Sequence, residues 1–486
     1  MNRGSSSMAI AETLRRELDQ YSPGEKLPSS RALVERFGVS PVTVSQAIAA
    51  LAGEGLVTTR PGAGAFRAAQ GVRAPAVDTS WQQIALNAEE QQYGERAPRV
   101  VDATGVIANL AAPVPGVIPF NGGYLHPSLQ PDQALAAALG RAARRPGAWE
   151  RPPVEGLPDL RSWFARDVGA AGLATANVLI SGGGQAALTT ALHALVPPGS
   201  AVLVESPTYP GALAIARAAG LRPIPVPMDD DGVRLDLLAD AFAATGARAF
   251  YSQPLFHNPT GVTLSTDRRH RLVQVAQSAG AFVLEDDYAR RLGHGGPADD
   301  RHLPAPLVAD DPYGVVVHIR SLTKPTSPSL RVAGLIGRGP VMERIRAIQV
   351  VSGFFVPRPL QEAALELVSA PAWLRHLRSA SAALRERREA MITSLRRRLP
   401  DLAATVRAPV GGYHLWVRLP DGMEETALTA VALHAGVAVS PGRPYFAGEP
   451  LAPHLRLSFA DTSDPGEIDE GVRRLANAVA SLQPVD

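Results

Sequence analysis

One lysine stands out among the residues that could carry out chemistry. The chain has 48 basic residues, of which only Lys26 and Lys324 are lysines. An arginine can replace a lysine on a solvated surface, but its guanidinium does not lose a proton and attack a carbonyl. Lys324 lies in Ser321-Leu-Thr-Lys-Pro, directly after the apolar run Val315-Val-Val-His-Ile. This position at a strand end predicts a lysine that forms a Schiff base; a lysine retained by chance is the alternative.

A glycine-rich segment upstream of this lysine could bind a phosphate. The run Ser181-Gly-Gly-Gly-Gln follows an expected strand and opens an expected helix. Backbone N–H groups at a helix N-terminus form a cradle for anions. The predicted phosphate-binding residues are Gly183, Gly184, Gln185, Ser321 and Arg331.

Four residues further along the chain could surround an aromatic cofactor. Tyr209 could stack on a ring, and Asn258, in Asn-Pro-Thr-Gly, could hydrogen-bond a phenolic oxygen that Tyr288 shares. Asp286 ends the run Phe-Val-Leu-Glu-Asp and could keep a pyridine nitrogen protonated. With a lysine and a phosphate cradle, these are the groups that pyridoxal phosphate chemistry needs. The predicted catalytic residues are Lys324, Asp286 and Tyr209, and the predicted cofactor is pyridoxal 5'-phosphate.

Arg456, in His-Leu-Arg-Leu-Ser near the end of the chain, could hold the carboxylate of a substrate or effector. Each candidate has an ordinary structural alternative when it is taken alone. A glycine cluster or Asn-Pro-Thr-Gly is usually a turn, and Asp286 could be an ion-pair or helix-cap residue. Their order along the chain argues against coincidence.

The first 69 residues carry the pattern of a winged helix-turn-helix. Apolar residues recur at helical spacing in three segments, with expected inward positions at Ile10, Leu14 and Leu18, then Ala32, Leu33 and Phe37, then Val44, Ala47, Ile48 and Leu51. Ser40 and Pro41 supply a cap and a first-turn proline for the third helix. Residues 56–66 contain several glycines and predict a tight hairpin.

Hydroxyl and guanidinium groups gather around the start of the third predicted helix. Such groups suit phosphates and base edges, and the hairpin could approach the DNA backbone or the minor groove. The predicted DNA-binding residues are Ser29, Arg31, Ser40, Thr43, Ser45, Arg60 and Gly62. Ser29 and Ser40 can also act as helix caps. Use of the whole unit for protein contacts is the alternative.

Composition excludes several classes of protein. The 486 residues are 45% hydrophobic and 19% charged, which is typical of a soluble globular chain. The absence of cysteine excludes disulfides and thiolate metal sites, and the eleven histidines show no paired ligand spacing, so we expect no metal. No apolar run reaches transmembrane length and no signal peptide is evident, so we expect a cytoplasmic protein without membrane contact. A net charge of +2 is too small to indicate a nucleic-acid partner by itself.

The remainder of the chain indicates an α/β domain. Apolar strand-like runs alternate with helical patterns, and polar or glycine-rich residues follow each run, where open α/β sheets bind ligands. The predicted domains are a winged helix-turn-helix at 1–69, a linker at 70–115 with one helix near 81–92, and an α/β domain at 116–486. The last divides into a large parallel-sheet part at about 150–360 and a smaller α+β part at about 361–486.

The two parts resemble different families. The N-terminal part resembles the GntR superfamily through Pro23-Gly-Glu-Lys-Leu-Pro-Ser-Ser-Arg31, Phe37-Gly-Val-Ser-Pro-Val-Thr-Val44, Glu54-Gly-Leu and Arg60-Pro-Gly-Ala-Gly64. Pro41 stands where that family commonly has a basic residue. From about Ile118 the chain resembles fold-type I aminotransferases, with Asp286, Lys324 and Arg331 as the closest matches. The combination is that of the MocR subfamily of GntR regulators.

One departure from the aminotransferase pattern concerns a neighbouring subunit. The family usually carries a Tyr-Gly pair before Gly156-Leu-Pro-Asp-Leu-Arg, and that tyrosine reaches the phosphate in the other subunit. Here the stretch is Glu150-Arg-Pro-Pro-Val-Glu, with Trp149 as the nearby aromatic residue. The resemblance therefore leaves the intersubunit phosphate contact, and efficient catalysis with it, unsupported.

The resemblance implies a homodimeric transcriptional regulator that binds a double-stranded DNA operator. Its large domain would sense pyridoxal phosphate, with or without an amine or amino acid effector. Two alternatives stay open: an active aminotransferase with a DNA-binding extension, and a scaffold whose pocket is inactive. Turnover separates the first from a regulator, and the presence of both Lys324 and Asp286 argues against the second.

Overall fold

The computed structural model describes residues 3–60, 63–68, 101–111, 114–295 and 303–482. The chain divides into two compact units, residues 1–92 and 93–486. Gly62 and the helix predicted near 81–92 lie outside the described residues, as does most of the predicted linker. Within that linker, however, Thr104–Ala108 forms a short helix, α6, that belongs to the second unit.

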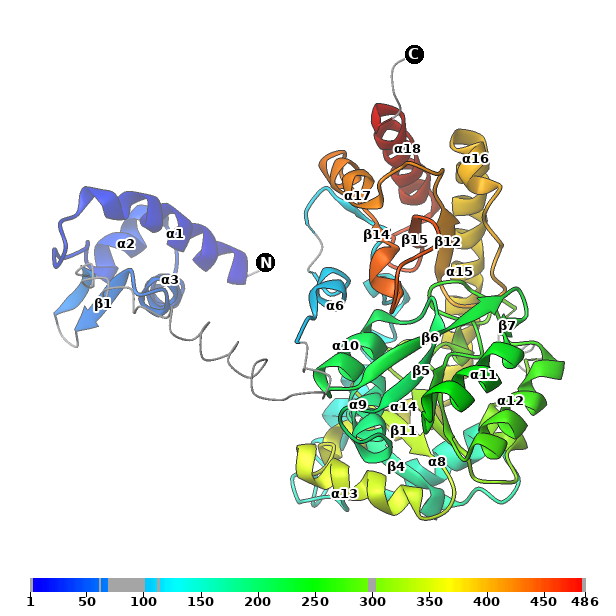
Figure 1. The fold of residues 1–486 in the computed structure, drawn as a ribbon. Helices are drawn as coiled ribbons and strands as arrows, with labels where there is room; N and C mark the ends of the chain where they lie inside the picture. Colours follow the sequence, from blue (N-terminus) through cyan, green and yellow to red (C-terminus); the bar gives the residue numbers. More distant parts are fainter. Residues whose placement is uncertain (1–2, 61–62, 69–100, 112–113, 296–302, 483–486) are drawn as a thin grey trace, which may run out of the picture. The chain divides into compact units, whose positions relative to one another are not determined.

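The N-terminal unit is a winged helix-turn-helix, as predicted (Figure 1). Its two-stranded wing is antiparallel, with Val57 opposite Arg67 and Arg60 opposite Gly64. The elements are α1 (Arg3–Glu17), η1 (Leu18–Gln20), α2 (Ser30–Phe37), α3 (Pro41–Gly53), β1 (Val57–Arg60) and β2 (Gly64–Arg67).

Local sequence explains where these helices begin and end. Ser29 caps α2 by accepting a hydrogen bond from the N–H of Ala32 at 3.2 Å, and α2 ends at Gly38, which adopts φ 63°. The predicted inward position of Ala32 is wrong, because Ala32 is exposed and Val34 packs against the core instead. Leu33 is the side chain of this helix that is fully buried.

The second unit contains an eight-stranded mixed sheet in the order β4-β11-β10-β9-β8-β5-β6-β7. β11 runs antiparallel to β10 and β4, and β7 runs antiparallel to β6, while the other neighbouring pairs are parallel. The strands are β4 (Val178–Ser181), β5 (Ala201–Ser206), β6 (Arg222–Asp229), β7 (Gly232–Val233), β8 (Ala249–Ser252), β9 (Phe282–Asp287), β10 (Val316–Ser321) and β11 (Ala333–Ile336).

Helices cover both faces of this sheet, and its central strands contribute buried apolar side chains to a core on each side (Figure 1). One face packs on α9 (Gly184–Leu195), α10 (Pro210–Ala218) and α13 (Val341–Gly353). The other packs on α8 (Pro158–Val168), α11 (Leu235–Thr245), α12 (Thr266–Ala279) and α14 (Arg358–Ser369). Beyond the sheet, α7 (Asp132–Ala142) packs on α14.

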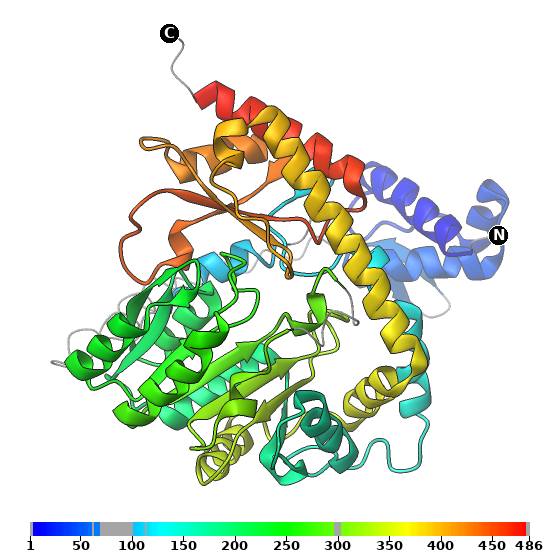
Figure 2. The same ribbon diagram turned by 90° about the vertical axis from the view of Figure 1, so that its right-hand side faces the viewer.

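A smaller α+β part has its own apolar core. The long helix α15 (Pro371–Arg398) contributes Leu377 to the core of the large part and Leu384 to that of the small part, so it connects the two (Figure 2). The small sheets are β12-β15-β14 and β13-β3. The elements are β3 (Ile118–Pro119), α16 (Pro400–Ala403), β12 (His414–Arg418), α17 (Glu425–His434), β13 (Val437–Ala438), β14 (Ser440–Pro441), β15 (His454–Ser458) and α18 (Pro465–Leu482).

Candidate cofactor pocket and DNA-binding surface

Ten of the predicted site residues line a single cavity in the second unit. They lie at or after the carboxyl ends of β4, β5, β8, β9 and β10, just before β11, and on β15, which are widely separated in the sequence. Parallel strands bring such residues to one edge of a sheet. The ten are Gly184, Gln185, Tyr209, Asn258, Asp286, Tyr288, Ser321, Lys324, Arg331 and Arg456.

The glycine-rich segment forms an anion cradle at the start of α9. Gly183 adopts φ 94° as the residue that precedes the helix. A Cβ at this position would lie 2.6 Å from Nη2 of Arg331, so glycine leaves room for the guanidinium beside the helix N-terminus. The side chain of Ser321 lies next to Gly184. Helix dipole, backbone N–H groups and guanidinium therefore suit a phosphate.

Lys324 extends into the cavity from the turn after β10. Its Nζ donates a hydrogen bond to the carbonyl of Gly123 at 2.8 Å and lies 3.9 Å from the ring centre of Tyr124. Removal from bulk water lowers the pKa of Lys324 to about 7, and the positive charges of Arg456 and Arg331 act in the same direction, while Asp286 opposes them. A neutral amine, which is the nucleophilic form, is therefore accessible near neutral pH.

Asp286 is held on the side of β9 that faces the cavity. Tyr251 and Gln253 donate hydrogen bonds to Oδ2 of Asp286, at 2.8 Å and 2.9 Å. Burial raises the pKa of this carboxyl, although both hydrogen bonds oppose the rise. Both described donors use Oδ2, so Oδ1 would be available to a protonated pyridine nitrogen.

Tyr209, Asn258 and Tyr288 all contact other protein groups. The hydroxyl of Tyr209 donates to Oε1 of Gln185 at 3.0 Å, and its ring lies against Gly211, where any Cβ would clash. The hydroxyl of Tyr288 donates to the carbonyl of Phe256 at 2.8 Å. Burial raises the pKa of both tyrosines, so both are hydrogen-bond donors. Their predicted contacts with a cofactor stay predictions.

Arg456 crosses from the small part to the cavity. Its Nη2 donates to the carbonyl of Asn121 at 2.6 Å, and its Nη1 lies 3.5 Å from Oδ1 of Asn258. Its Nε is buried and has no hydrogen-bond partner among the described residues. A buried guanidinium with an unused donor suits a ligand carboxylate.

Sequence reasoning missed part of this cavity. α6 and the residues after it contribute Val106, Asn109 and Leu110 to the wall, although they lie within the predicted linker. The other missed residues that line it are Gly123, Tyr124, Leu188, Pro210, Gln253, Thr323, Tyr413 and His414. Thr323 lies beside Lys324 just after a predicted strand, which is a signal that could have found it.

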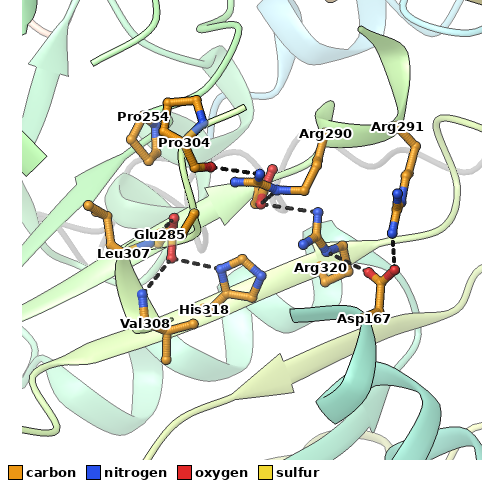
Figure 3. A network of polar contacts seen from close by, with 12 residues as sticks. Asp167, Pro254, Glu285, Arg290, Arg291, Pro304, Leu307, Val308, His318 and Arg320 are labelled. Carbon is orange, nitrogen blue, oxygen red and sulfur yellow. Dashed lines mark hydrogen bonds and ion pairs between the residues drawn. The ribbon is translucent and has the colours of Figure 1, made fainter. Parts of the chain in front are cut away.

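A network of buried charges lies on the opposite face of the same strands (Figure 3). His318 bonds Glu285 at 2.7 Å, and Arg290 and Arg320 contact Asp287 at 2.6 Å and 3.1 Å. Burial opposes ionisation of Asp287, but the two arginines outweigh it and lower the pKa of its carboxyl. Ligand atoms of Glu285, Asp287 and His318 lie within 4.8 Å of one another, yet the arginines already supply the countercharge that a cation would bring. The network braces the strands that carry Asp286 and lead to Lys324.

The N-terminal unit presents an exposed face of α3 beside the wing. Ser40 caps α3 by accepting from the N–H of Thr43 at 3.3 Å, so its hydroxyl has the predicted capping role, which can coexist with a DNA contact. Arg31 is exposed, and the guanidinium of Arg60 lies 4.8 Å from the ring centre of Phe66. The exposed face of α3 also carries Gln46.

Comparison with known proteins assigns both units. Residues 121–475 match the family of class I and II aminotransferases, and residues 7–66 match the bacterial regulatory proteins of the gntR family. The chain belongs to the class I and II aminotransferase family. Its N-terminal unit is a GntR-type domain, and the cofactor of its second unit is pyridoxal phosphate. When bound, that cofactor acts as an electron sink at the carbon next to an amine.

Two relatives and one solved structure illustrate this double relationship. The chain is 34% identical over 372 residues to a 2-aminoadipate transaminase of Thermus thermophilus, covering 76% of this chain and 91% of the relative. It is 26% identical over 481 residues to the probable rhizopine catabolism regulatory protein MocR of Rhizobium meliloti, covering 98% and 94%. The crystal structure of LysN, the α-aminoadipate aminotransferase of T. thermophilus, superposes with a TM-score of 0.71 at 32% identity, covering 81% and 98%. The chain thus has the architecture of a pyridoxal-phosphate-dependent, DNA-binding regulator.

Proposed function

We propose that this chain is a homodimeric transcriptional regulator whose second unit senses pyridoxal phosphate, alone or together with an amine or amino acid. The observation that carries the proposal is a GntR-type domain in the same chain as a cavity lined by ten of the predicted site residues. Binding in the pocket would change the affinity of the N-terminal unit for a double-stranded operator. None of the described helices is long and apolar enough to cross a membrane. We infer a cytoplasmic location from the similarity to transcriptional regulators.

A second copy of the chain would bind the second half-site of the operator. The N-terminal unit is small, so one copy would bind a half-site weakly, and pairing through the second unit would raise the affinity. Trp149 and Val351 support such pairing because they are 80% and 85% exposed, as does Phe354, at 68%. We infer that the second copy covers these three side chains.

The pocket also supports an effector beyond the cofactor. An amino acid could react at Lys324 while Arg456 holds its carboxylate, since Arg456 has a buried donor without a described partner. The ligand can change DNA binding only if its affinity differs between two arrangements of the protein.

The decisive experiment measures operator affinity with and without pyridoxal phosphate. Apo-protein is titrated onto operator DNA before and after the cofactor is restored, and we expect a change of several-fold, or about 1 kcal/mol or more of coupling. Lys324→Ala should reduce the response, although Asp286, Arg331 and the cradle can still hold the cofactor without a covalent bond. Equal affinity of the two forms would exclude pyridoxal phosphate alone as the signal.

A working aminotransferase is the second candidate. It is favoured by the convergence of Lys324, Asp286 and Arg456 and by the identity to a transaminase. Amino acid and 2-oxo acid are supplied together, and product is followed over many cycles. A regulator should stop after a half-reaction equal to its cofactor content, whereas continued product formation without any effect on DNA binding would favour the enzyme.

A further inference from the structure

We propose that Gln253 is a positioning residue that joins the group facing the cofactor's pyridine nitrogen to the loop facing its phenolic oxygen. The proposal requires pyridoxal phosphate in the pocket, but it does not require any particular effect on DNA. It can therefore fail while the regulatory function stands, and the reverse also holds.

The register of two parallel strands brings Gln253 to this place. Tyr251 of β8 pairs with Leu284 of β9, and Ser252 pairs with Glu285. The next residue after β8, Gln253, therefore comes level with Asp286. Because side chains alternate along a strand, both side chains point to the face that holds the cavity.

The hydrogen bonds of the Gln253 amide leave one orientation. The backbone N–H of Asn258 donates to Oε1 of Gln253 at 3.2 Å. A backbone N–H can only donate, so the carbonyl side of the amide must face Asn258. The NH₂ group then faces Asp286 and donates to its Oδ2 at 2.9 Å. One side chain thus connects the two residues assigned to the pyridine nitrogen and the phenolic oxygen.

The backbone of Gln253 is fixed as well. Its N–H donates to Oε2 of Glu205 at 2.7 Å, and the hydroxyl of Ser252 donates to Oε1 of the same carboxylate at 2.7 Å. Gln253 is only 3% exposed. Gln253 is thus held by two hydrogen bonds of its side-chain amide and one of its backbone N–H. A buried residue held in this way has little freedom, so a displacement of Asp286 or of the Asn258 loop is passed to the other.

The consequence concerns where a proton resides. A donor to Oδ2 makes the carboxylate of Asp286 a weaker base, so a proton shared with the pyridine nitrogen stays on that nitrogen. Tyr251 donates to the same oxygen but makes no described contact with Asn258. It is therefore a matched control: Tyr251→Phe removes one donor and keeps the connection, whereas Gln253→Met removes both.

The test uses the full-length protein loaded with cofactor labelled with ¹⁵N at the pyridine nitrogen. In both Gln253→Met and Tyr251→Phe, the ¹⁵N resonance should move toward the position of the unprotonated ring. In Gln253→Met, the pH at which the absorption of the bound cofactor changes should also rise by about one unit, the size expected for one lost hydrogen bond. The rise follows because a loosened Asn258 stabilises the anionic phenolic oxygen less.

A double-mutant cycle with Asn258→Ala separates the connection from simple loss of a donor. The shift measured in the cycle is that of the pH at which the absorption of the bound cofactor changes. The shift caused by Gln253→Met should be strongly non-additive with that of Asn258→Ala, whereas any shift caused by Tyr251→Phe should be additive with it. An unmoved ¹⁵N resonance in Gln253→Met, or additive shifts for both variants, would overturn the proposal. If Gln253→Met does not fold, the shorter, branched apolar variant Gln253→Leu is judged by the same outcomes.

Discussion

The two functional regions of this chain use polar side chains in opposite ways. In the cofactor pocket, charged and polar groups from distant segments converge in a site withdrawn from water, where burial lowers the pKa of Lys324 and raises that of Asp286. On the DNA-binding unit, Arg31 and Arg60 are exposed, and α3 carries no charged residue at all. Interactions in a low-dielectric site are strong, whereas exposed charges are screened by salt. Substitutions in the pocket should therefore have large effects on cofactor binding. Substitutions on the surface should change DNA affinity by smaller amounts that depend on salt concentration.

The largest effect should come from removing the pocket lysine. Lys324→Ala should abolish the visible absorption band of covalently bound pyridoxal phosphate, because no other side-chain amine lies in the pocket. Lys26 is the only other lysine of the chain and is exposed on the N-terminal unit, so Lys26→Arg is the matched control and should keep the full band. A band that survives in Lys324→Ala and disappears in Lys26→Arg would refute the site.

The second effect is a displaced pH dependence of cofactor incorporation. Only a neutral amine attacks the aldehyde, so the rate should rise with pH and level off above about 7, the pKa of Lys324, instead of above about 10.4 as for an ordinary lysine. Stopped-flow absorbance after mixing apo-protein with pyridoxal phosphate gives this profile. Arg456→Met removes a positive charge that lowers the pKa, so its inflection should lie at higher pH. Inflections at the same pH in both proteins would contradict the electrostatic explanation.

The contrast between the regions also explains what could be predicted from sequence. Lys324 and Asp286 could be predicted as pocket residues because Asp286 ends an apolar run and Lys324 comes shortly after one, and the cap at Ser40 could be predicted because it precedes a helical pattern. Gln253 was missed because its contact with Asp286 depends on the register of β8 against β9, which periodicity does not reveal. Asn109 was missed because the wall it forms depends on the packing of α6. Local patterns therefore predict the helices, strands and motifs. The contacts of Gln253 and Asn109 depend on long-range packing, which these patterns do not reveal.

The third effect is a moderate, salt-sensitive loss of operator affinity. Arg31→Ala and Arg60→Ala should each weaken operator binding and, if the contact is to phosphate, lower the slope of log affinity against log salt by about one. The absorption spectrum of the bound cofactor should not change. Gln46→Ala is the comparison, because an exposed glutamine on α3 can read a base edge: it should change sequence preference without changing the slope. Unaltered affinity in both arginine variants would favour a protein-contact role for the N-terminal unit.

The smallest effect separates the two roles that a single hydroxyl can have. Ser40 caps α3, and its Oγ also lies 2.8 Å from Oγ1 of Thr43. Ser40→Ala should lower the free energy of unfolding of the N-terminal unit by about 1 kcal/mol, measured by hydrogen exchange of the α3 amides. Ser40→Asp keeps a good cap and a favourable charge at the helix N-terminus, so its exchange should resemble that of the unaltered protein. Its operator affinity should nevertheless fall sharply if Ser40 approaches a phosphate, because the carboxylate repels the DNA backbone. If Ser40→Asp binds the operator normally, Ser40 is a cap alone, and base or phosphate contacts must come from Thr43, Ser45 or the arginines.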